Sequence, residues 1–143
     1  MQPFTLIADD DSPMTLVQRL EEELYEFNAN TTGIRDGRGL SLVCRDAGGE
    51  LIGALCGHTW GGCCEIKQLW VAAPFRGRGL GRRLMEAAEA EARERGCGQM
   101  VLTTHSFQAP RLYVRLGFEV VATLDDYPAS HQHLLLRKKL SRA

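Results

Sequence analysis

A glycine- and arginine-rich segment in the middle of the chain is its most informative feature. Residues 69–83 read Leu-Trp-Val-Ala-Ala-Pro-Phe-Arg-Gly-Arg-Gly-Leu-Gly-Arg-Arg. An apolar, strand-like run ends at Val71, three alternating glycines follow, and a helical periodicity begins within them. Such a turn directs several backbone N–H groups and the positive end of a helix dipole at one place. Because glycine has no side chain, an anion can approach these groups closely. With four arginines in eight residues, the segment predicts a phosphate or pyrophosphate site.

Known phosphate-binding loops narrow this prediction. A P-loop requires Lys-Ser or Lys-Thr after its second glycine, and the segment has neither. In a dinucleotide fingerprint the third glycine comes one residue later than it does here, and the loop opens an early βαβ unit. The remaining pattern, Arg76-x-x-Gly79-x-Gly81, resembles the R/Q-x-x-G-x-G/A motif of the GCN5-related N-acetyltransferases, the GNAT family. A solvated Arg/Gly turn or an RNA-contacting segment is the alternative.

The rest of the chain alternates between strand-like and helix-like patterns. Gly96 and Gly117 are expected to end two helices, and the first helix is expected to begin at Pro13 with Asp11 or Ser12 as its N-cap. Residues 28–39 are expected to form a loop or a weak short helix. Strands are expected at residues 4–8, 40–45, 51–59, 64–71, 100–104, 118–124 and 133–137, and the other helices at 79–95 and 108–116. No repeat or linker interrupts this order, which predicts a single α+β domain over residues 1–143.

The surroundings of the glycine-rich segment extend the resemblance to residues 40–140. Residues 69–71 resemble the family's fourth strand, which separates from its neighbour and pairs its free backbone with the pantetheine arm of the cofactor. Residues 112–118, Leu-Tyr-Val-Arg-Leu-Gly-Phe, resemble the family's Leu-Tyr-x-x-x-Gly-Phe block. Residues 106–109 and 124–128 resemble a bacterial subgroup of small, uncharacterised members. The resemblance implies the acyl-CoA N-acyltransferase fold, in which helices flank a mixed central sheet of six to seven strands.

The resemblance also implies roles in acetyl transfer. Tyr113 is expected to protonate the leaving coenzyme A sulfur, since an ordinary tyrosine stays protonated at neutral pH. Glu65, eleven residues before Arg76, is the expected base, with a histidine or ordered water as the alternative. The Val71 N–H is the expected oxyanion donor. The histidines considered are His58, His105, His131 and His133.

Binding of acetyl-CoA is expected to involve the turn, the strand before it and the start of the Tyr113 helix. Ser106 stands where many family members have asparagine, seven residues before the tyrosine, and serine can still donate one hydrogen bond. The residues expected to contact the cofactor are Leu69, Trp70, Val71, Arg76, Gly77, Arg78, Gly79, Leu80, Gly81, Arg82, Ser106, Ala109 and Tyr113.

Composition limits the partners. Seventeen Lys and Arg against 18 Asp and Glu give a formal charge of −1, and 7% aromatic residues are few for base stacking, so no nucleic acid is expected. No apolar run approaches the roughly 18 residues of a membrane span, and the first residues lack a signal-peptide pattern. No membrane association is therefore expected, and five cysteines without C-x-x-C spacing favour a reducing cytoplasm.

The cysteines offer two further hypotheses, both disfavoured. Cys63 and Cys64 follow His58, but the spacing and a fourth ligand of a zinc site are missing, so no metal is expected. No histidine is positioned in sequence to activate either thiol, which argues against an acetyl-cysteine route. The cysteines are expected to be small, buried apolar residues.

The expected function is acetyl-CoA-dependent N-acetylation of a primary amine of a small molecule, peptide or protein by direct transfer. A catalytically idle acyl-CoA-binding or sensory domain is the alternative, and the resemblance allows a homodimer. The acceptor is expected near residues 24–38, the strand ends at His58 and Trp60, or the connection 125–133. Asp125, Asp126 and Glu22 would suit a cationic amine.

Overall fold

Two units make up the chain in the computed structural model, which describes residues 2–140: Met1–Arg35 and Asp36–Ala143. The first contains α1 (Met14–Thr32), which ends at Gly33, where φ is +74° and the N–H donates to the Ala29 carbonyl at 2.8 Å. The single domain expected over residues 1–143 stays a prediction.

Three expectations for the first unit are wrong. The N-cap of α1 is Pro13 and no side chain caps it, so neither Asp11 nor Ser12 has that role. Residues 28–32 continue the long helix α1, so the loop expected over residues 28–39 is limited to 33–37, and Arg38 and Gly39, in the second unit, already belong to a strand. Residues 4–8 form no strand, because a strand needs a partner and α1 is the only regular element described in this unit.

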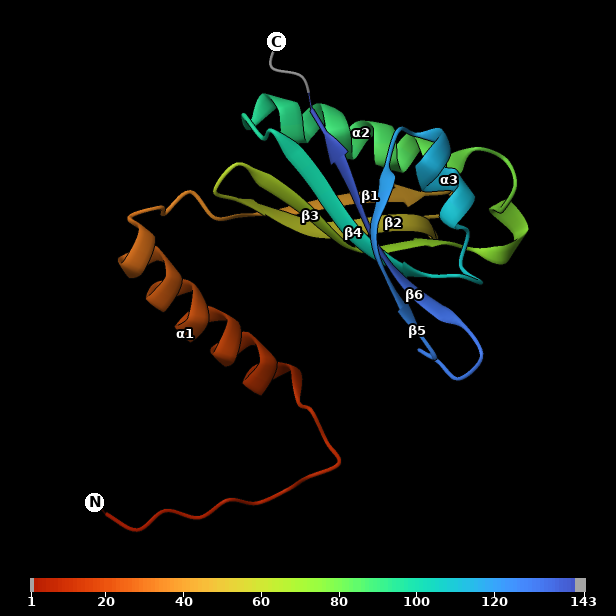
Figure 1. Cartoon of the computed structure of the whole chain (residues 1–143). Helices are drawn as coiled ribbons and strands as arrows, with labels where there is room; N and C mark the ends of the chain where they lie inside the picture. The colour runs from red at the N-terminus through yellow and green to blue at the C-terminus, as the bar shows by residue number, and fades with distance from the viewer. Residues whose placement is uncertain (1, 141–143) are drawn as a thin grey trace. The chain divides into compact units, whose positions relative to one another are not determined.

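The second unit is built on a mixed six-stranded sheet, which confirms the predicted fold class (Figure 1). The strand order is β1-β2-β3-β4-β6-β5, with β3 and β4 parallel and every other neighbouring pair antiparallel. The strands are β1 (Arg38–Arg45), β2 (Leu51–Trp60), β3 (Cys63–Val71), β4 (Gln99–His105), β5 (Glu119–Asp125) and β6 (Gln132–Lys139).

Both helices of this unit that exceed one turn lie on the same face of the sheet (Figure 1). They are α2 (Leu80–Glu94) and α3 (Pro110–Arg115); a short 3-10 turn, η1 (Ala73–Phe75), precedes α2. The helix expected at residues 79–95 is confirmed by α2, whose apolar residues Leu84, Met85, Ala88 and Ala92 are buried against the sheet. Gly53 of β2 permits this packing, because a Cβ there would lie 3.0 Å from the Leu80 side chain.

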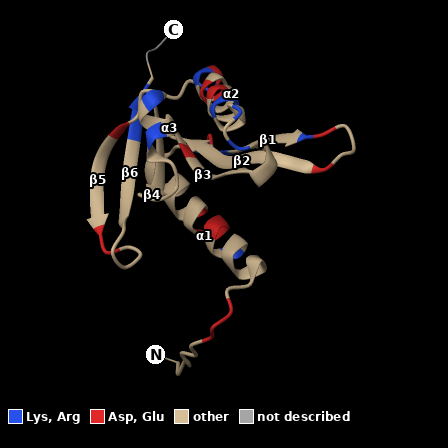
Figure 2. Ribbon diagram, turned by 90° about the vertical axis from the view of Figure 1, so that its right-hand side faces the viewer, with Lys and Arg blue, Asp and Glu red and all other residues tan. Residues whose placement is uncertain are grey.

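The outer side of α2 carries interleaved charges (Figure 2). Two pairs of opposite charge at i,i+4 spacing are present, with Glu89–Arg93 at 3.2 Å and Glu91–Arg95 at 2.9 Å. Gly96 follows the helix with φ +78°, as expected for its C-terminal stop. Buried side chains of the strands, among them Cys64, Ile66, Met100 and Leu102, point toward α2. We call the opposite surface of the sheet the far face.

Candidate active site

The two parallel strands at the centre of the sheet separate halfway along their length. β3 pairs with β4 only from Cys63 opposite Gln99 to Ile66 opposite Leu102. Beyond this point β3 continues along β2 as far as Val71, and β4 continues along β6 as far as His105. Among the described residues, the β3 backbone from Gln68 to Val71 therefore has a strand partner on one side only. This wedge can accept hydrogen bonds from an extended ligand.

A bulge in β3 marks the start of the wedge. The pairing with β2 skips Lys67, since Ile66 is opposite Gly57 and Gln68 is opposite Cys56. Because Lys67 is an extra residue in β3, the alternation of side chains between the two faces of the sheet shifts by one position after it. Before the bulge the side chains that face α2 are Cys64 and Ile66; after it, Leu69 and Val71 pack against the core, and Trp70 is 47% exposed. The predicted contacts Leu69, Trp70 and Val71 thus all lie beside the wedge.

Gly57 makes the bulge possible, and the sequence reasoning did not single it out. A Cβ at this position would lie 2.1 Å from the Glu65 carbonyl oxygen, closer than any real contact. A glycine inside a strand pattern is the signal that could have identified it, because such glycines often mark a bulge or a close backbone approach.

The glycine-rich turn has the predicted backbone conformation. Gly77 and Gly79 have φ of +75° and +82°, and a Cβ at either would meet nothing within 4 Å. Gly81 lies within the first turn of α2. At the start of α2, the Arg83 N–H donates a hydrogen bond to the Gly79 carbonyl, at 3.0 Å. The N–H groups of Leu80, Gly81 and Arg82 precede it and have no acceptor inside the helix, which is the donor arrangement that an anion needs.

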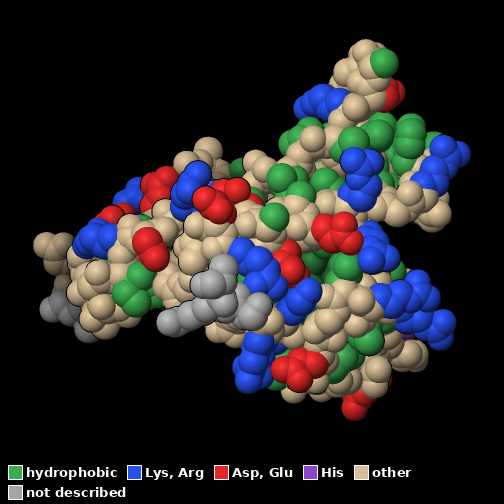
Figure 3. Space-filling view, turned by 90° about the horizontal axis from the view of Figure 1, so that it is seen from above, with side chains coloured by type: hydrophobic (Ala, Val, Ile, Leu, Met, Phe, Trp, Pro, Cys, Tyr) green, Lys and Arg blue, Asp and Glu red, His purple; other side chains and the backbone are tan. Residues whose placement is uncertain are grey.

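The arginines of the turn have different roles. Arg76 uses its Nε to donate to the Val71 carbonyl at 2.9 Å, so it connects the end of β3 to the turn. Arg78 lies over the Phe75 ring at 6.0 Å, and Arg82 pairs with Glu86 at 2.7 Å. Figure 3 shows Lys and Arg side chains gathered at the right-hand end of the view, on the side where α2 begins. The turn therefore combines backbone donors with positive charge.

Tyr113, the predicted acid, is brought close to the glycine-rich turn by α3, the helix that carries it. A Cβ at Gly81 would lie 3.5 Å from Leu112 and 3.9 Å from Val71, so the start of α2, the end of β3 and α3 converge. Tyr113, next to Leu112 in α3, packs against the core with its ring 6.1 Å from Phe118. Burial raises the pKa of Tyr113 above its ordinary value, which keeps the phenol protonated.

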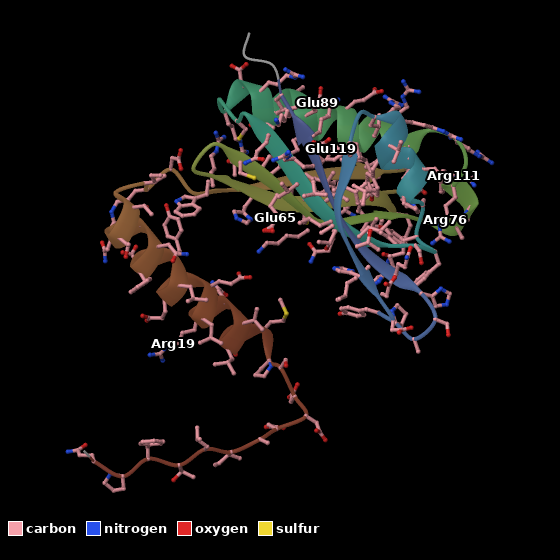
Figure 4. The ribbon with its side chains drawn as sticks, in the orientation of Figure 1. Arg19, Glu65, Arg76, Glu89, Arg111 and Glu119 are labelled. Carbon is pink, nitrogen blue, oxygen red and sulfur yellow. The ribbon has the colours of Figure 1, made fainter. Side chains whose placement is uncertain are left out.

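Glu65 lies on the other side of the sheet. Its neighbours Cys64 and Ile66 face α2, so the Glu65 carboxylate points to the far face (Figure 4). It is opposite His58 of β2, whose Nδ1 is 3.9 Å from Oε1 of Glu65, and both side chains are partly exposed. The structure thus places the predicted base and Tyr113 on opposite faces of the sheet, and the wedge begins beyond Ile66, the residue that follows Glu65.

Ser106 and Ala109 lie in the connection between β4 and α3. Ser106 is tied to β6: its N–H donates to the Gln132 carbonyl at 2.9 Å, and its Oγ accepts from the Gln132 N–H at 3.1 Å. The Ser106 hydroxyl hydrogen remains available as a donor. Ala109, the N-cap of α3, has φ of +100°, a conformation that is strained for alanine.

Cys64 and Cys97 are buried as expected, whereas Cys56 is exposed. Cys63 and Cys64 do not have the properties of nucleophiles. Burial, followed by the neighbouring Cys97, raises the pKa of Cys64 to about 12 and that of Cys63 above its ordinary value. The thiolate is the reactive form, so these thiols are unreactive at neutral pH. Among residues 2–140, no three His, Cys, Asp or Glu side chains are grouped as a metal site would require.

Comparison with known proteins identifies the family. The sequence profile described as "Acetyltransferase (GNAT) family" matches residues 4–118. Blasticidin-S acetyltransferase of Streptomyces morookaense is 45% identical over 93 residues, which cover 64% of this chain and 68% of that protein. An acetyltransferase of Agrobacterium fabrum is 31% identical over 95% of this chain and 99% of its own length. A crystal structure titled as an acetyltransferase from Agrobacterium tumefaciens has a TM-score of 0.84 and 28% identity, covering 96% of this chain and all of that one.

The fold and these relatives define an acetyltransferase. The chain belongs to the GNAT family and is an N-acetyltransferase of that family. Among residues 2–140, no helix is both long and apolar enough to cross a membrane.

Proposed function

We propose that this enzyme transfers the acetyl group of acetyl-CoA directly to a primary amine. The observation that carries the proposal is the convergence of three elements at Gly81: the N-terminus of α2, the separated end of β3, and α3 with Tyr113. Backbone N–H groups from Arg76 to Arg82 would hold the diphosphate, and the free edge of Leu69–Val71 would pair with the pantetheine amides. Ser106 and Ala109 line the β4–α3 connection next to the wedge.

Residues on both sides of the sheet would share the proton transfers. The Glu65 carboxylate accepts the proton that the amine must lose, either directly or through water, as the C–N bond forms. The Val71 N–H stabilises the negative charge that develops on the acetyl oxygen. As the C–S bond breaks, Tyr113 donates its phenolic proton to the departing sulfur. The raised pKa of Tyr113 fits this role, because the group has to be protonated when transfer occurs.

The acceptor is proposed to be an amine on a small molecule, peptide or protein. The blasticidin-S relative supports a small-molecule acceptor, because its name identifies an antibiotic as its substrate. The absence of a metal, of nucleic acid and of membrane partners, and the cytoplasmic location, stay predictions, and a homodimer stays a possibility that the family resemblance allows.

Turnover of acetyl-CoA with a panel of primary amines tests this function. The thiol of released coenzyme A is followed by a colorimetric reagent, and the acetylated amine by mass spectrometry. We expect release only when an amine is present, with one acetylated amine formed per thiol. Tight coenzyme A binding without acetylation of any amine would instead support the idle acyl-CoA-binding domain.

A further inference from the structure

Five aromatic and histidine rings are in contact where β4 ends and the β5–β6 connection begins. We call His105, Phe107, Tyr127, His131 and His133 the ring cluster. The His105 ring stacks on Phe107 with centroids 5.4 Å apart and on the edge of Tyr127 at 5.1 Å. Tyr127 also stacks on His133 at 5.0 Å, and His131 contacts Phe107 at 5.0 Å. These residues come from two segments far apart in the sequence, 105–107 and 127–133, which the pairing of β6 with β4 brings together (Figure 1).

Hydrogen bonds hold the cluster in one arrangement. His105 Nδ1 is 3.1 Å from the Tyr127 carbonyl, which can only accept, so this nitrogen is the donor. His133 Nδ1 lies 3.4 Å from the same nitrogen, so the two imidazole rings are in contact through these atoms. The backbone N–H of His105 also donates to the Gln108 side-chain oxygen Oε1 at 2.8 Å. A surface that is already ordered loses little conformational entropy when it binds a ligand.

The Phe107 and Tyr127 rings of this ordered cluster remain accessible, and His131 is exposed as well. Phe107 is 58% exposed and Tyr127 is 52% exposed, whereas the Phe118 ring near Tyr113 is buried. Exposed aromatic faces gain free energy by stacking on a planar ring and by contact with a cation. Phe107 and Tyr127, stacked on the half-buried His105 and His133, therefore present exposed rings that are suited to a planar, positively charged ligand.

The local charge favours a cation as well. Residues 124–133, which comprise the end of β5, its connection to β6 and the start of β6, contain Asp125 and Asp126 but no Lys or Arg. Asp125 is oriented by the Gln132 side chain at 3.0 Å, and Asp126 accepts from the Ser130 N–H at 3.4 Å. A primary amine is protonated at neutral pH, so these carboxylates attract it to the rings.

The cluster adjoins the wedge. His105 is the last residue of β4, in the part of the strand that no longer pairs with β3, and Thr104 before it is buried toward α2. The His105 side chain therefore lies on the far face, which is also the face of Glu65. Ser106, which separates His105 from Phe107, is one of the predicted cofactor contacts. An acceptor on the rings would thus approach the wedge from the side that carries the expected base.

We propose that the ring cluster binds the acceptor, and that the acceptor is a small cationic amine with its amino group close to a planar aromatic ring. This inference rests on the proposed function, in which the acceptor of the acetyl group is a primary amine. The ring would stack on Phe107 and Tyr127, while Asp125 and Asp126 favour the ammonium form on arrival. The ammonium group then loses its proton at the wedge.

A matched pair of ligands tests the inference by binding, without turnover. The protein saturated with coenzyme A is titrated with 2-phenylethylamine and with its saturated analogue 2-cyclohexylethylamine, and binding is followed by NMR. The two amines have the same chain length and charge and differ in the planar ring. We expect about tenfold tighter binding of the aromatic amine, the size of effect that one or two ring contacts produce.

Variants test whether the ring cluster causes the preference for the aromatic amine. Phe107→Leu and Tyr127→Leu keep apolar side chains but remove the aromatic faces, and each should reduce the preference, with little left in the double variant. Val120→Ala, an exposed change on β5, is the control and should keep it. Circular dichroism and coenzyme A affinity confirm that each variant is folded. Equal affinity for the two amines, or a preference that survives the double variant, would overturn the inference.

Turnover by the same preparations separates this inference from the proposed function. A ring-dependent binding preference without acetylation supports the ring cluster as a binding site and contradicts the proposed function. Acetylation of both amines with equal kcat/KM supports the proposed function and overturns the inference. Acetylation of a peptide N-terminus that carries no aromatic residue, as fast as of 2-phenylethylamine, overturns it as well.

Discussion

Tyr113 shows how the position of one residue determines its chemistry. It lies in α3 against the core, and burial raises its pKa, so the phenol remains a proton donor over the whole physiological range. The sequence could predict this residue because a local block, Leu-Tyr-x-x-x-Gly-Phe, surrounds it. It could not predict that Arg76 would direct its Nε to the Val71 carbonyl, since this contact depends on how the turn folds back on β3.

Replacing Tyr113 by phenylalanine tests its role as the acid. The ring and its packing remain, and only the proton donor is lost. We expect kcat to fall by about 10²-fold or more, while coenzyme A affinity is retained. Steady-state kinetics and calorimetric titration on the same preparation measure the two quantities. An unchanged kcat would remove Tyr113 from this role.

Burial of Tyr113 also predicts a pH dependence of stability. Because the folded state raises the pKa of this phenol, its contribution to stability is fully present below the ordinary pKa, about 10, and is lost as pH rises through the folded value. Urea unfolding between pH 8 and 11 should show a steeper loss of stability in the wild type than in Tyr113→Phe. Parallel curves would mean that the phenol is solvated.

At the scale of elements, the strands show which features are local and which are not. Alternation of apolar residues and the glycine turns predicted most strand and helix positions correctly. The bulge at Lys67 and the separation of β3 from β4 beyond Ile66 depend on which residues face each other across strands, so no local pattern revealed them. The ring cluster is likewise a product of β4 lying next to β6.

Adding one methyl group at Gly57 should disturb the bulge. A Cβ there would lie 2.1 Å from the Glu65 carbonyl oxygen, and a backbone atom cannot yield as a flexible side chain can. We expect Gly57→Ala to destabilise the fold by about 1–3 kcal/mol, measured by urea unfolding, and to lower activity. Gly39→Ala on β1, where a Cβ would meet nothing within 4 Å, is the matched control. Equal stability of both variants would show that β2 and β3 can move apart at the bulge at little cost in free energy.

Glu89 connects α2 to β6, and its loss should be visible in the pH dependence of stability. Burial alone would raise its pKa, but hydrogen bonds and charge from Lys138, at 2.5 Å, and from Arg93 outweigh this and lower it. The stabilising contribution is therefore present above the ordinary pKa and is lost as pH falls through the lowered value. We expect Glu89→Gln to lose about 1 kcal/mol at pH 7 and almost nothing at pH 2, measured by urea unfolding. A pH-independent loss would contradict the ion-pair explanation.

At the scale of the whole molecule, the sequence predicted the α+β class and the mixed sheet but placed one strand too many. Residues 4–8 have a strand-like composition, yet pairing requires a neighbouring edge, which composition cannot supply. The candidate site was easier to predict than this terminus, because a turn that binds diphosphate needs glycines and a helix start within one short segment. The ring cluster could be found only in the three-dimensional structure, since its residues come from the ends of two strands and from two connections that are far apart in the sequence.

Calorimetric titration with coenzyme A and with pantetheine, which lacks the diphosphate, tests the central claim that the turn after β3 binds a diphosphate. We expect the wild type to bind coenzyme A much more tightly than pantetheine, and Gly81→Glu to abolish this difference by bringing a carboxylate to the donor groups. Gly98→Glu, at an exposed glycine where a Cβ meets nothing within 4 Å, should bind coenzyme A like the wild type. Equal affinity of wild type and Gly81→Glu for coenzyme A would contradict the claim.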